Sequence, residues 1–478
     1  MIELTRKQIQ QFRATVRQAL GLTSARRALT ITFVTTSESL AIRAATDNVA
    51  LEYRVPGEFP PLCLAVPYEA LAACEGRQED LVRFEQAADQ VTLNWSDAGI
   101  PQSAQYATSE PTTFPESAES LVSIDRQFLS AMADACESTQ HDSARFALNC
   151  VRLRGADGQI AATDAQQALL QTGFHFPWNN EILVPSTAVF GTKAFREAQN
   201  VSIGTATDWL FVRVDAWTVA LKIEKERCFP EIDNQLPNVS AATTTLTLAE
   251  PDADFLTRAS KRLPGAKEMN APVTLDLNGA VVVRAKSDEQ PSPIDLILRN
   301  SQRRGDELRI DSNRNFLVRA IQLGFRDIHF RGPDAPAFCH HGHRSYLWAL
   351  LGNDAALQPD AAAIRIESPV AAQTVQAPSR SRVLRGNAPS PPHQQPRKQT
   401  AMKPNPSEET NSPPTENTRT EATTTTNLIA DAEALRVTLR DALSKTTTLV
   451  LGLKRQRQQS KLMRSALQSL RAVQAIET

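Results

Sequence analysis

The sequence predicts an α+β protein that contains three tandem copies of one domain. Three anchors recur in the same order in each copy: a Phe in a helical segment, an Ala-Thr-Asp-like turn, and a hydrophobic residue that precedes a second helix. They are Phe12, Ala45-Thr46-Asp47 and Val66-Pro67 in copy one, Phe128, Ala162-Thr163-Asp164 and Val184-Pro185 in copy two, and Phe255, Ala285-Lys286-Ser287-Asp288 and Ile310-Asp311 in copy three. A period of roughly 120 residues is too long for a solenoid unit and indicates repeated domains.

Each copy reads as helix, strands, helix, strands. Apolar residues at helical spacing predict helices over 5–20, 68–74, 124–136, 186–199, 252–263 and 312–322. Alternating segments between them predict antiparallel strands, for example over 29–34, 49–55, 81–84 and 91–95. The expected domains are residues 1–112, 113–238 and 239–367.

Composition changes near residue 368. Ten prolines lie between Pro369 and Pro414, which predicts a disordered Pro/Thr-rich linker over 368–426. Apolar residues then step by four and three from Leu428 to Leu453, so we expect a basic amphipathic helix over 427–476. This helix could form a coiled coil, dock on the acidic body or contact DNA. Residues 368–478 hold 16 Lys and Arg against 8 Asp and Glu, net +8, whereas the remaining 36 basic and 45 acidic residues give the body a net charge of −9.

Several classes of protein are disfavoured. No apolar run approaches the roughly 20 residues that span a bilayer, no signal peptide is visible at the N-terminus, and six scattered cysteines suggest reduced thiols of a cytoplasmic protein. Glycine-rich phosphate loops and nucleophile elbows are missing, so we expect neither catalysis nor a cofactor. The one cluster that could bind zinc is Cys339-His340-His341-Gly342-His343, but no second Cys/His cluster is present to complete a site, and a loop between strands is the simpler interpretation.

Specific residues resemble the bacterial β sliding clamp, the β subunit of DNA polymerase III. The resemblance covers residues 1 to about 366 and is clearest in copy two, where 145–151 is followed by Ala162-Thr163-Asp164 and 182–185. Cys228-Phe229-Pro230-Glu231 with Leu236-Pro237 resembles the connector between that family's second and third domains. Residues 313–317 and 346–351 resemble its last helix and last strand.

The resemblance implies a head-to-tail homodimeric ring of six domains that encircles duplex DNA and makes a replicative or repair polymerase processive. Its partners would be double-stranded DNA, the polymerase and the clamp-loader subunits, and it would be cytoplasmic and associated with the nucleoid. Such a hole needs diffuse positive charge rather than base-reading groups. The alternative is a clamp-fold paralogue that acts as a scaffold or regulator of DNA replication or repair without standard loading.

The predicted helices carry the basic residues that the resemblance assigns to DNA. Arg26, in the loop after the first helix, matches a family position that contacts DNA. The other candidates are Arg6, Lys7, Arg13 and Arg17 in copy one, Arg126, Lys193 and Arg196 in copy two, and Arg258, Lys261, Arg262, Arg314 and Arg319 in copy three.

The resemblance also implies a groove for partner peptides between the second and third domains. Its expected residues are Leu148, Thr163, Gln166, Gln167, Pro230, Gln235, Leu347 and Ala349. The family's Gly-His-Arg-Leu after Thr-Asp is Ala165-Gln166-Gln167-Ala168 here, and Gln235 replaces an apolar residue. Because buried amides cost free energy unless they are paired, we expect weaker binding of apolar peptide anchors.

Overall fold

The structure, a computed structural model, describes residues 1–22, 29–140, 146–288, 290 and 292–370. All the described residues belong to one compact unit of the chain. Arg26, the helix expected over 427–476 and all of the linker except Ser368–Val370 lie outside the described residues. No helix in the described part is long and apolar enough to cross a membrane.

Three sets of elements follow one another in the same order: strand, helix, four strands, helix, three strands. The first set is β1 (Ile2–Thr5), α1 (Arg6–Ala19), β2 (Thr30–Thr35), β3 (Ser39–Ala45), β4 (Val49–Pro56), β5 (Cys63–Pro67), α2 (Tyr68–Cys74), β6 (Leu81–Ala87), β7 (Gln90–Asp97) and β8 (Ile100–Ala107). The second is β9 (Val122–Ser123), α3 (Gln127–Cys136), β10 (Cys150–Arg154), β11 (Gln159–Thr163), β12 (Gln167–Gln171), β13 (Glu181–Pro185), η1 (Ala188–Gly191) with α4 (Lys193–Arg196), β14 (Val201–Ala206), β15 (Trp209–Val214) and β16 (Trp217–Lys222).

The third set has the same order with three additional strands. It comprises β17 (Thr244–Thr247), α5 (Glu250–Ala259) with η4 (Ser260–Arg262), β18 (Pro272–Asp276), β19 (Val282–Ala285), β20 (Ile294–Ile297), β21 (Gln302–Gly305), β22 (Arg309–Asn313), α6 (Arg314–Gln322), β23 (Asp327–Phe330), β24 (Ala337–His341), β25 (Arg344–Trp348), β26 (Leu350–Gly352) and β27 (Ile364–Glu367). Two further 3₁₀ turns, η2 (Asp233–Gln235) and η3 (Val239–Ala241), lie in the connector before β17. The prediction of a tandem α+β fold with antiparallel sheets is therefore confirmed, while the exact domain limits stay predictions.

The sequence anchors occupy equivalent places in the three copies. The Ala-Thr-Asp turns and their degraded third version join β3 to β4, β11 to β12, and β19 to β20. In copy two the Thr163 hydroxyl accepts a hydrogen bond from the Ala165 amide (3.0 Å), and the Asp164 carboxylate accepts bonds from the amides of Gln166 and Gln167 (both 2.8 Å). These side chains satisfy the backbone of the tight turn, which is why Thr and Asp recur there.

Local sequence explains the first helix. Thr5 and Gln8 form a reciprocal capping box at the start of α1, and Ile9, Phe12 and Val16 form its buried face. The helix predicted over 186–199 is instead divided into η1 and α4, because Thr192 is extended (φ −71°, ψ 156°) and interrupts the helical path after Gly191. The closing segment 346–351 is also two strands rather than one, since β25 and β26 belong to different sheets.

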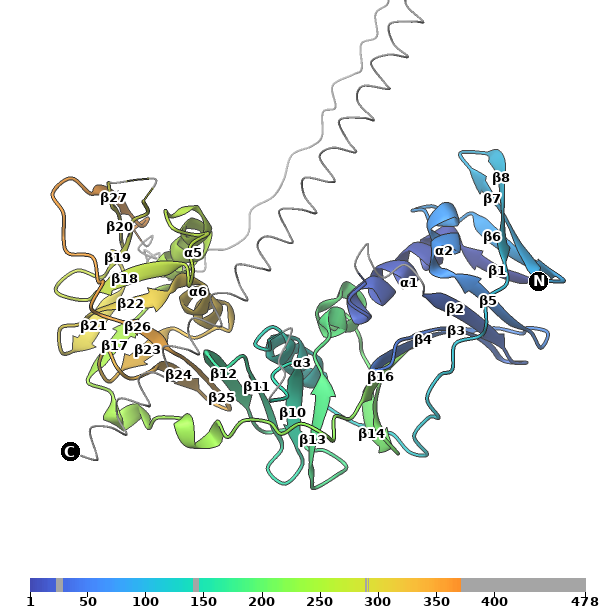
Figure 1. The fold of residues 1–478 in the computed structure, drawn as a ribbon, viewed down its shortest axis with the longest axis horizontal. Helices are drawn as coiled ribbons and strands as arrows, with labels where there is room; N and C mark the ends of the chain where they lie inside the picture. The colour runs from blue at the N-terminus through green and yellow to red at the C-terminus, as the bar shows by residue number, and fades with distance from the viewer. Residues whose placement is uncertain (23–28, 141–145, 289, 291, 371–478) are drawn as a thin grey trace, which may run out of the picture. The chain divides into compact units, whose positions relative to one another are not determined.

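Sheets run across the boundaries between copies (Figure 1). An eight-stranded sheet in the order β5-β2-β3-β4-β16-β15-β14-β9 joins copies one and two through β4 and β16. A nine-stranded sheet in the order β13-β10-β11-β12-β25-β24-β23-β17-β21 joins copies two and three through β12 and β25. Each joint is antiparallel and contains five residue pairs. The two outer sheets are β1-β6-β7-β8 and β26-β22-β18-β19-β20-β27.

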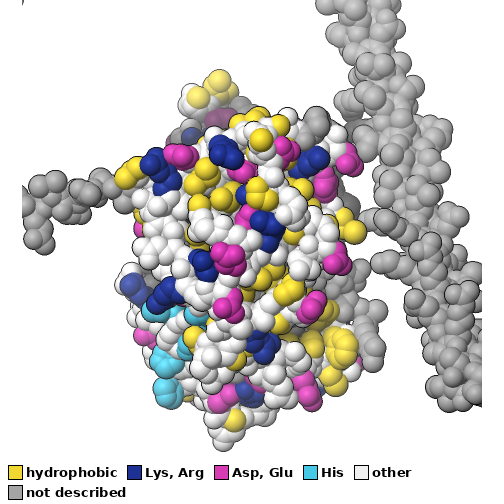
Figure 2. Space-filling model, turned by 90° about the vertical axis from the view of Figure 1, so that its left-hand side faces the viewer, with side chains coloured by type: hydrophobic (Ala, Val, Ile, Leu, Met, Phe, Trp, Pro, Cys, Tyr) yellow, Lys and Arg dark blue, Asp and Glu magenta, His cyan; other side chains and the backbone are white. Residues whose placement is uncertain are grey.

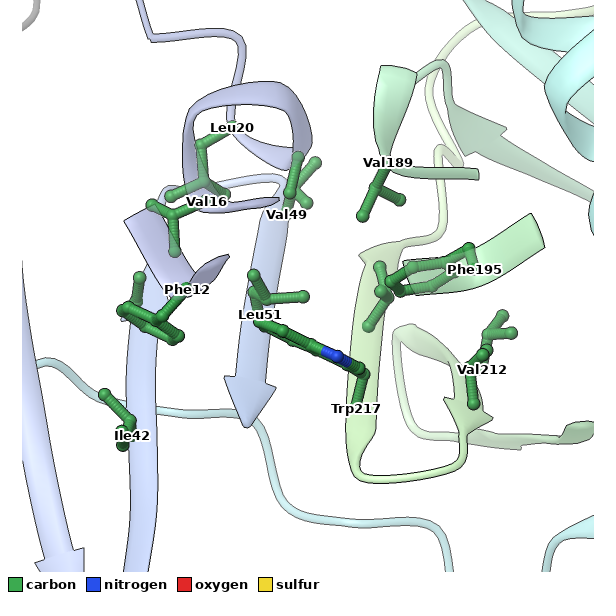
Figure 3. Packing of buried hydrophobic residues seen from close by; sticks show 14 of the residues in the cluster. Phe12, Val16, Leu20, Ile42, Val49, Leu51, Val189, Phe195, Val212 and Trp217 are labelled. Carbon is green, nitrogen blue, oxygen red and sulfur yellow. The ribbon is translucent and has the colours of Figure 1, made fainter. Parts of the chain in front are cut away.

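The first joint has its own aromatic core (Figure 3). Trp217 of β16 is 7% exposed and stacks on Phe12 of α1, with 6.0 Å between ring centroids and 7° between planes. Its ring also lies 4.4 Å from that of Tyr53 in β4 and 6.5 Å from that of Phe195 in α4. Because residues of both copies enclose the Trp217 indole, its burial stabilises the contact between the two copies as well as filling the core.

We predict that Trp217→Ala destabilises the body and loosens this joint. Loss of a buried Trp with three aromatic neighbours should cost about 3–5 kcal/mol of unfolding free energy. Amide hydrogen exchange should accelerate in β4 and β16 more than in β10 or β18. Trp95→Ala, in the partly exposed β7 within copy one, is the control, and equal acceleration in both variants would contradict the special role of Trp217.

We also predict that Ala165→Gly stabilises the β11–β12 turn. Ala165 has φ +71°, in the left-handed region where a Cβ atom is unfavourable and glycine is not. Unfolding free energy measured by denaturant titration should rise by about 1 kcal/mol. Ala168→Gly, in β12 of the same hairpin, should lower it, and a stabilisation by both changes would point away from the turn.

Candidate functional site

A groove of about 790 Å³ lies on the second joint, between copies two and three. Its position follows from strand pairing: Gln167 and Ala168 of β12 lie opposite Trp348 and Leu347 of β25, and the Ala349 amide donates to the Gln166 carbonyl (2.8 Å). The connector after Phe229 and the loop 333–336 complete the walls. The groove therefore exists only because two copies share a sheet.

All eight residues predicted for this groove line it. They are Leu148, Thr163, Gln166, Gln167, Pro230, Gln235, Leu347 and Ala349. Leu148 and Leu347 are 6% and 7% exposed, and Leu347 belongs to a small apolar cluster beneath the groove that includes Phe229, Ile232 and Phe338. An apolar floor with a polar rim suits a ligand that has hydrophobic anchors.

The three glutamines of the groove differ in environment. Gln167 is buried, and its amide nitrogen donates to Asp164 Oδ2 (2.9 Å) while its Oε1 accepts from the Tyr346 hydroxyl (2.6 Å). Its amide is thus paired, and the expected cost of an unpaired amide does not apply to it. Gln166 and Gln235 are exposed, so the cost would fall on them when a ligand covers them.

Sequence reasoning missed part of the lining. Pro333, Asp334, Ala335 and Pro336 form one wall, and the Pro-Asp-Ala-Pro pattern is a turn signal that marks this loop. Asp354 also lines the groove and is exposed like Asp334, so two carboxylates stand at its rim.

Two of the basic residues predicted to contact DNA have structural roles instead. Arg6 is 6% exposed, and its guanidinium donates to the carbonyls of Cys74, Glu75 and Ser96 (each 3.2 Å) and to Asp97 (2.8 Å). The predictions for Arg6 and Arg314 are therefore wrong, because neither guanidinium is open to a phosphate.

Arg314 is the first residue of α6, the second helix of copy three. It is 2% exposed, and its guanidinium donates to the carbonyls of Ser260 (3.2 Å), Leu263 (3.0 Å), Ala271 (3.0 Å) and Pro272 (2.7 Å). Burial lowers the pKa of Arg314 from its usual value. Both Arg6 and Arg314 are the first residue of a helix, and both donate hydrogen bonds to the carbonyls of neighbouring loops. The position in a helix alone could not distinguish such a buried arginine from one that is exposed to solvent.

A second group of predicted cations is paired with acidic residues. Arg319 of α6 is 13% exposed and bonds to Glu137 (2.6 Å) and Asp134 (3.4 Å) at the end of α3. Arg13 pairs with Glu75 and lies over the Tyr68 ring, 4.8 Å from its centroid.

Lys7 and Lys193 form more exposed pairs. Lys7 lies 2.6 Å from Glu79, and Lys193 lies 3.8 Å from Glu197. Exposed pairs of this kind exchange readily with water and ions, so these two lysines still contribute positive charge to the surface.

The remaining predicted cations are exposed and make no ion pair within the described part of the chain. They are Arg17 in α1, Arg126 and Arg196 in copy two, and Arg258, Lys261 and Arg262 in copy three. Arg258 donates to the Asp254 carbonyl of its own helix (3.2 Å). All three copies thus supply solvent-facing cations from helical segments.

The helices that carry these cations follow one another from copy to copy. Thr187, which caps η1, donates through its hydroxyl to the Ala19 carbonyl at the end of α1 (2.8 Å), and the Arg319 pairs join α6 to α3. In Figure 1 the α-helices of the body lie on one side of the two shared sheets, and the helical turns of the connector before β17 lie on the other. A row of positive charge along one side can attract a polyanion without fixing it in one register.

The Cys/His segment does not converge on one point. Cys339 is fully buried in the core of copy three, and burial raises its pKa well above the usual value. His340 and His341 are exposed, and His340 Nδ1 lies 2.9 Å from the Ser345 hydroxyl across the β24–β25 hairpin. Among the described residues no group of three or more His, Cys, Asp or Glu is arranged to hold a metal ion.

Comparison with known proteins identifies the architecture. No protein-family model and no curated protein matches the chain. A DnaN sliding clamp (DNA polymerase III subunit beta) from Pseudomonas aeruginosa bound to griselimycin matches with 16% identity and a TM-score of 0.58, over 73% of this chain and 98% of that one.

Two clamps from other bacteria match to the same extent. The DNA polymerase III beta chain from Streptococcus pneumoniae and the DNA polymerase sliding clamp from Bacillus subtilis are each 14% identical, with a TM-score of 0.59, over 73% of this chain and 98% of theirs. The chain therefore has, at very low sequence identity, the fold of the bacterial β sliding clamps of DNA polymerase III.

Proposed function

We propose that this protein is a divergent, non-catalytic sliding clamp whose homodimeric ring encircles duplex DNA and tethers a polymerase. The observation that carries the proposal is the repeated joint: the same antiparallel pairing links copy one to two and copy two to three, and the α-helices stay on one side of the shared sheets. A ring in which every pair of neighbouring copies is joined by this antiparallel pairing has its α-helices around the hole and its sheets on the outside.

The exposed cations support DNA as the substance that passes through the hole. Cations come from helical segments of every copy, and Arg126 and Arg196 also line a cavity of about 470 Å³ beside α3. Contact with phosphates alone favours sliding, because the backbone is the same at every step along the duplex. In this proposal the protein acts in the cytoplasm at the nucleoid.

The groove at the second joint is the proposed binding site for short peptide segments of polymerases and clamp-loader subunits. Its apolar floor would receive hydrophobic side chains, and its exposed amides and rim carboxylates would select among partners. Gln235 and Ala165-Gln166-Gln167-Ala168 differ from the residues that the sliding-clamp family usually has at these positions. These differences favour a specialised set of partners. If the protein is not retained on circular DNA in the experiment below, the alternative function is favoured: a scaffold with the clamp fold that is not loaded on DNA.

We predict that reversing one exposed helical cation in each copy abolishes stable retention on DNA. Arg17→Glu, Arg126→Glu and Arg262→Glu together should reduce by at least tenfold the protein that stays on nicked circular DNA after loading by a clamp loader with ATP, because phosphates would face like charges. Retention is measured by gel filtration. Wild-type protein should leave the DNA when the circle is cut, since the link is topological.

The matched control moves the same amount of charge elsewhere. Arg213→Glu, Lys222→Glu and Arg331→Glu change exposed residues of β15, of β16 and of the loop after β23. Arg213 and Lys222 alternate with Val212, Val214 and Leu221 of the core beneath the helices, so they lie on the opposite face of the sheet. Equal losses in both triple variants, or no loss in the helical one, would contradict the assignment.

We predict opposite effects for two glutamines of the groove. Gln235→Leu should tighten binding of a fluorescent peptide with apolar anchors by about fivefold, because an exposed amide no longer loses its water. Gln167→Leu should weaken binding and lower thermal stability, because it leaves the buried Tyr346 hydroxyl without its acceptor. Fluorescence anisotropy measures both, and the same direction in the two variants would exclude this groove as the peptide site.

A further inference from the structure

The repeat specifies which strand edges should join two copies of the chain. At both internal joints the third strand after the first helix of one copy pairs with the third strand after the second helix of the next copy: β4 with β16, and β12 with β25. The corresponding strands without an internal partner of this kind are β20 in copy three and β8 in copy one. Applied once more, the rule pairs β20 of one molecule with β8 of a second.

The β8 edge is open. Within the described residues β8 pairs only with β7, and six of its eight residues are exposed, including Ile100 at 62%. The Thr108 amide donates to the Asp89 carbonyl of the β7 side (2.9 Å), so by alternation the amides of Gln105 and Ser103 point outward. Pro101 occupies another outward position, where the missing N–H costs no internal hydrogen bond.

The β20 edge, in contrast, is occupied. β27 lies beside it in parallel register, with Ile294 opposite Ile364 and Ile297 opposite Glu367. The amides of Ile364 and Ser368 donate to the carbonyls of Pro293 and Ile297 (both 2.9 Å). Since β19 holds the other edge of β20, β27 and the β8 strand of a second copy cannot both pair with β20.

Side chains at the end of β27 hold it in place. Ser368 is 2% exposed and its hydroxyl accepts from the Arg299 amide (3.0 Å), while the Arg299 guanidinium pairs with Glu367 (2.7 Å). Asn300 also donates to the Pro369 carbonyl (2.8 Å). β27 follows β26, which pairs with β22 in the same sheet, so the segment is an addition to the repeated plan rather than part of it.

We propose that β27 is an intramolecular cap on the ring-closing edge, and that the ring closes only when β27 leaves β20 and β8 of a second copy takes its place. This inference rests on the proposed ring. An inserted β27 would separate the two molecules by one strand spacing, about 4.8 Å, which neither internal joint contains. The cap must therefore be displaced rather than incorporated.

The cap is built so that displacement is feasible. It contributes four parallel pairs, whereas each internal joint has five antiparallel pairs, and parallel pairing is slightly weaker per residue. All four residues of β27 are exposed, Ile364 by 49% and Ile366 by 41%, so the strand buries little apolar surface. Figure 2 views the body from the end where Figure 1 labels β20 and β27; apolar, basic and acidic side chains are interspersed on this face.

The test uses proline substitutions in the full chain. The Ile366 amide points toward β20 by alternation with Ile364 and Ser368, and the Arg365 amide points away. Ile366→Pro should release the cap and lower the dimer dissociation constant at least tenfold in sedimentation velocity over a concentration series. Arg365→Pro, the matched control, should behave like the wild type. Glu367→Arg, which opposes Arg299, should act in the same direction as Ile366→Pro with less risk to folding.

Adding Gln105→Pro to Ile366→Pro should return the protein to monomer, because it blocks the outward edge of β8. Weaker dimerisation after Ile366→Pro would overturn the cap and make β27 part of the interface. If the wild type and Ile366→Pro have the same dimer dissociation constant, and Gln105→Pro dissociates both dimers, the cap would be overturned but the proposed ring would stand. Monomers throughout, or dimers that Gln105→Pro does not affect, would overturn both the cap and the proposed ring.

Discussion

Edge-to-edge pairing of β-strands is the interaction on which the rest of this molecule depends. An unpaired strand edge exposes a row of amide and carbonyl groups that must bond to water or to another strand. Here the edges left by one copy are satisfied by the next, through β4 with β16 and β12 with β25. Backbone bonds do not depend strongly on side-chain identity. A chain that is only 14–16% identical to the clamps of known structure can therefore still have their fold.

The two candidate binding surfaces follow from these joints. Sharing a sheet keeps the helices of successive copies on one side, where Arg17, Arg126 and Arg262 face solvent. The second joint also leaves a groove where the turn before β12 meets the end of β25. Neither surface belongs to a single copy, so a change that loosens a joint should disturb binding at a distance from its own position.

The pairing rule also explains why the ends of the body differ. Among the residues that the structure describes, the β8 edge has no further strand beside it, and the β20 edge is covered by a strand that no repeat predicts. Open edges favour unwanted association, and natural proteins commonly protect them. A weakly buried strand is suited to protecting an edge that must later be used, because little apolar surface has to be re-exposed to water when it leaves.

The sequence by itself determined the repeat and the α+β class, and its resemblance to the sliding clamps predicted the residues of the groove. These depend on local signals: the apolar period of α1, the Thr-Asp turns, and short motifs kept in order, and all eight predicted groove residues meet in one place. Only the tertiary structure decided the roles of the arginines. Arg6 and Arg314 occupy helical positions like that of Arg17, yet they are buried because neighbouring loops present carbonyls to them. The sequence also did not show that a strand covers β20. Ile364-Arg365-Ile366-Glu367 alternates as a strand should, but the edge that a short strand joins depends on long-range backbone pairing, which the local pattern does not encode.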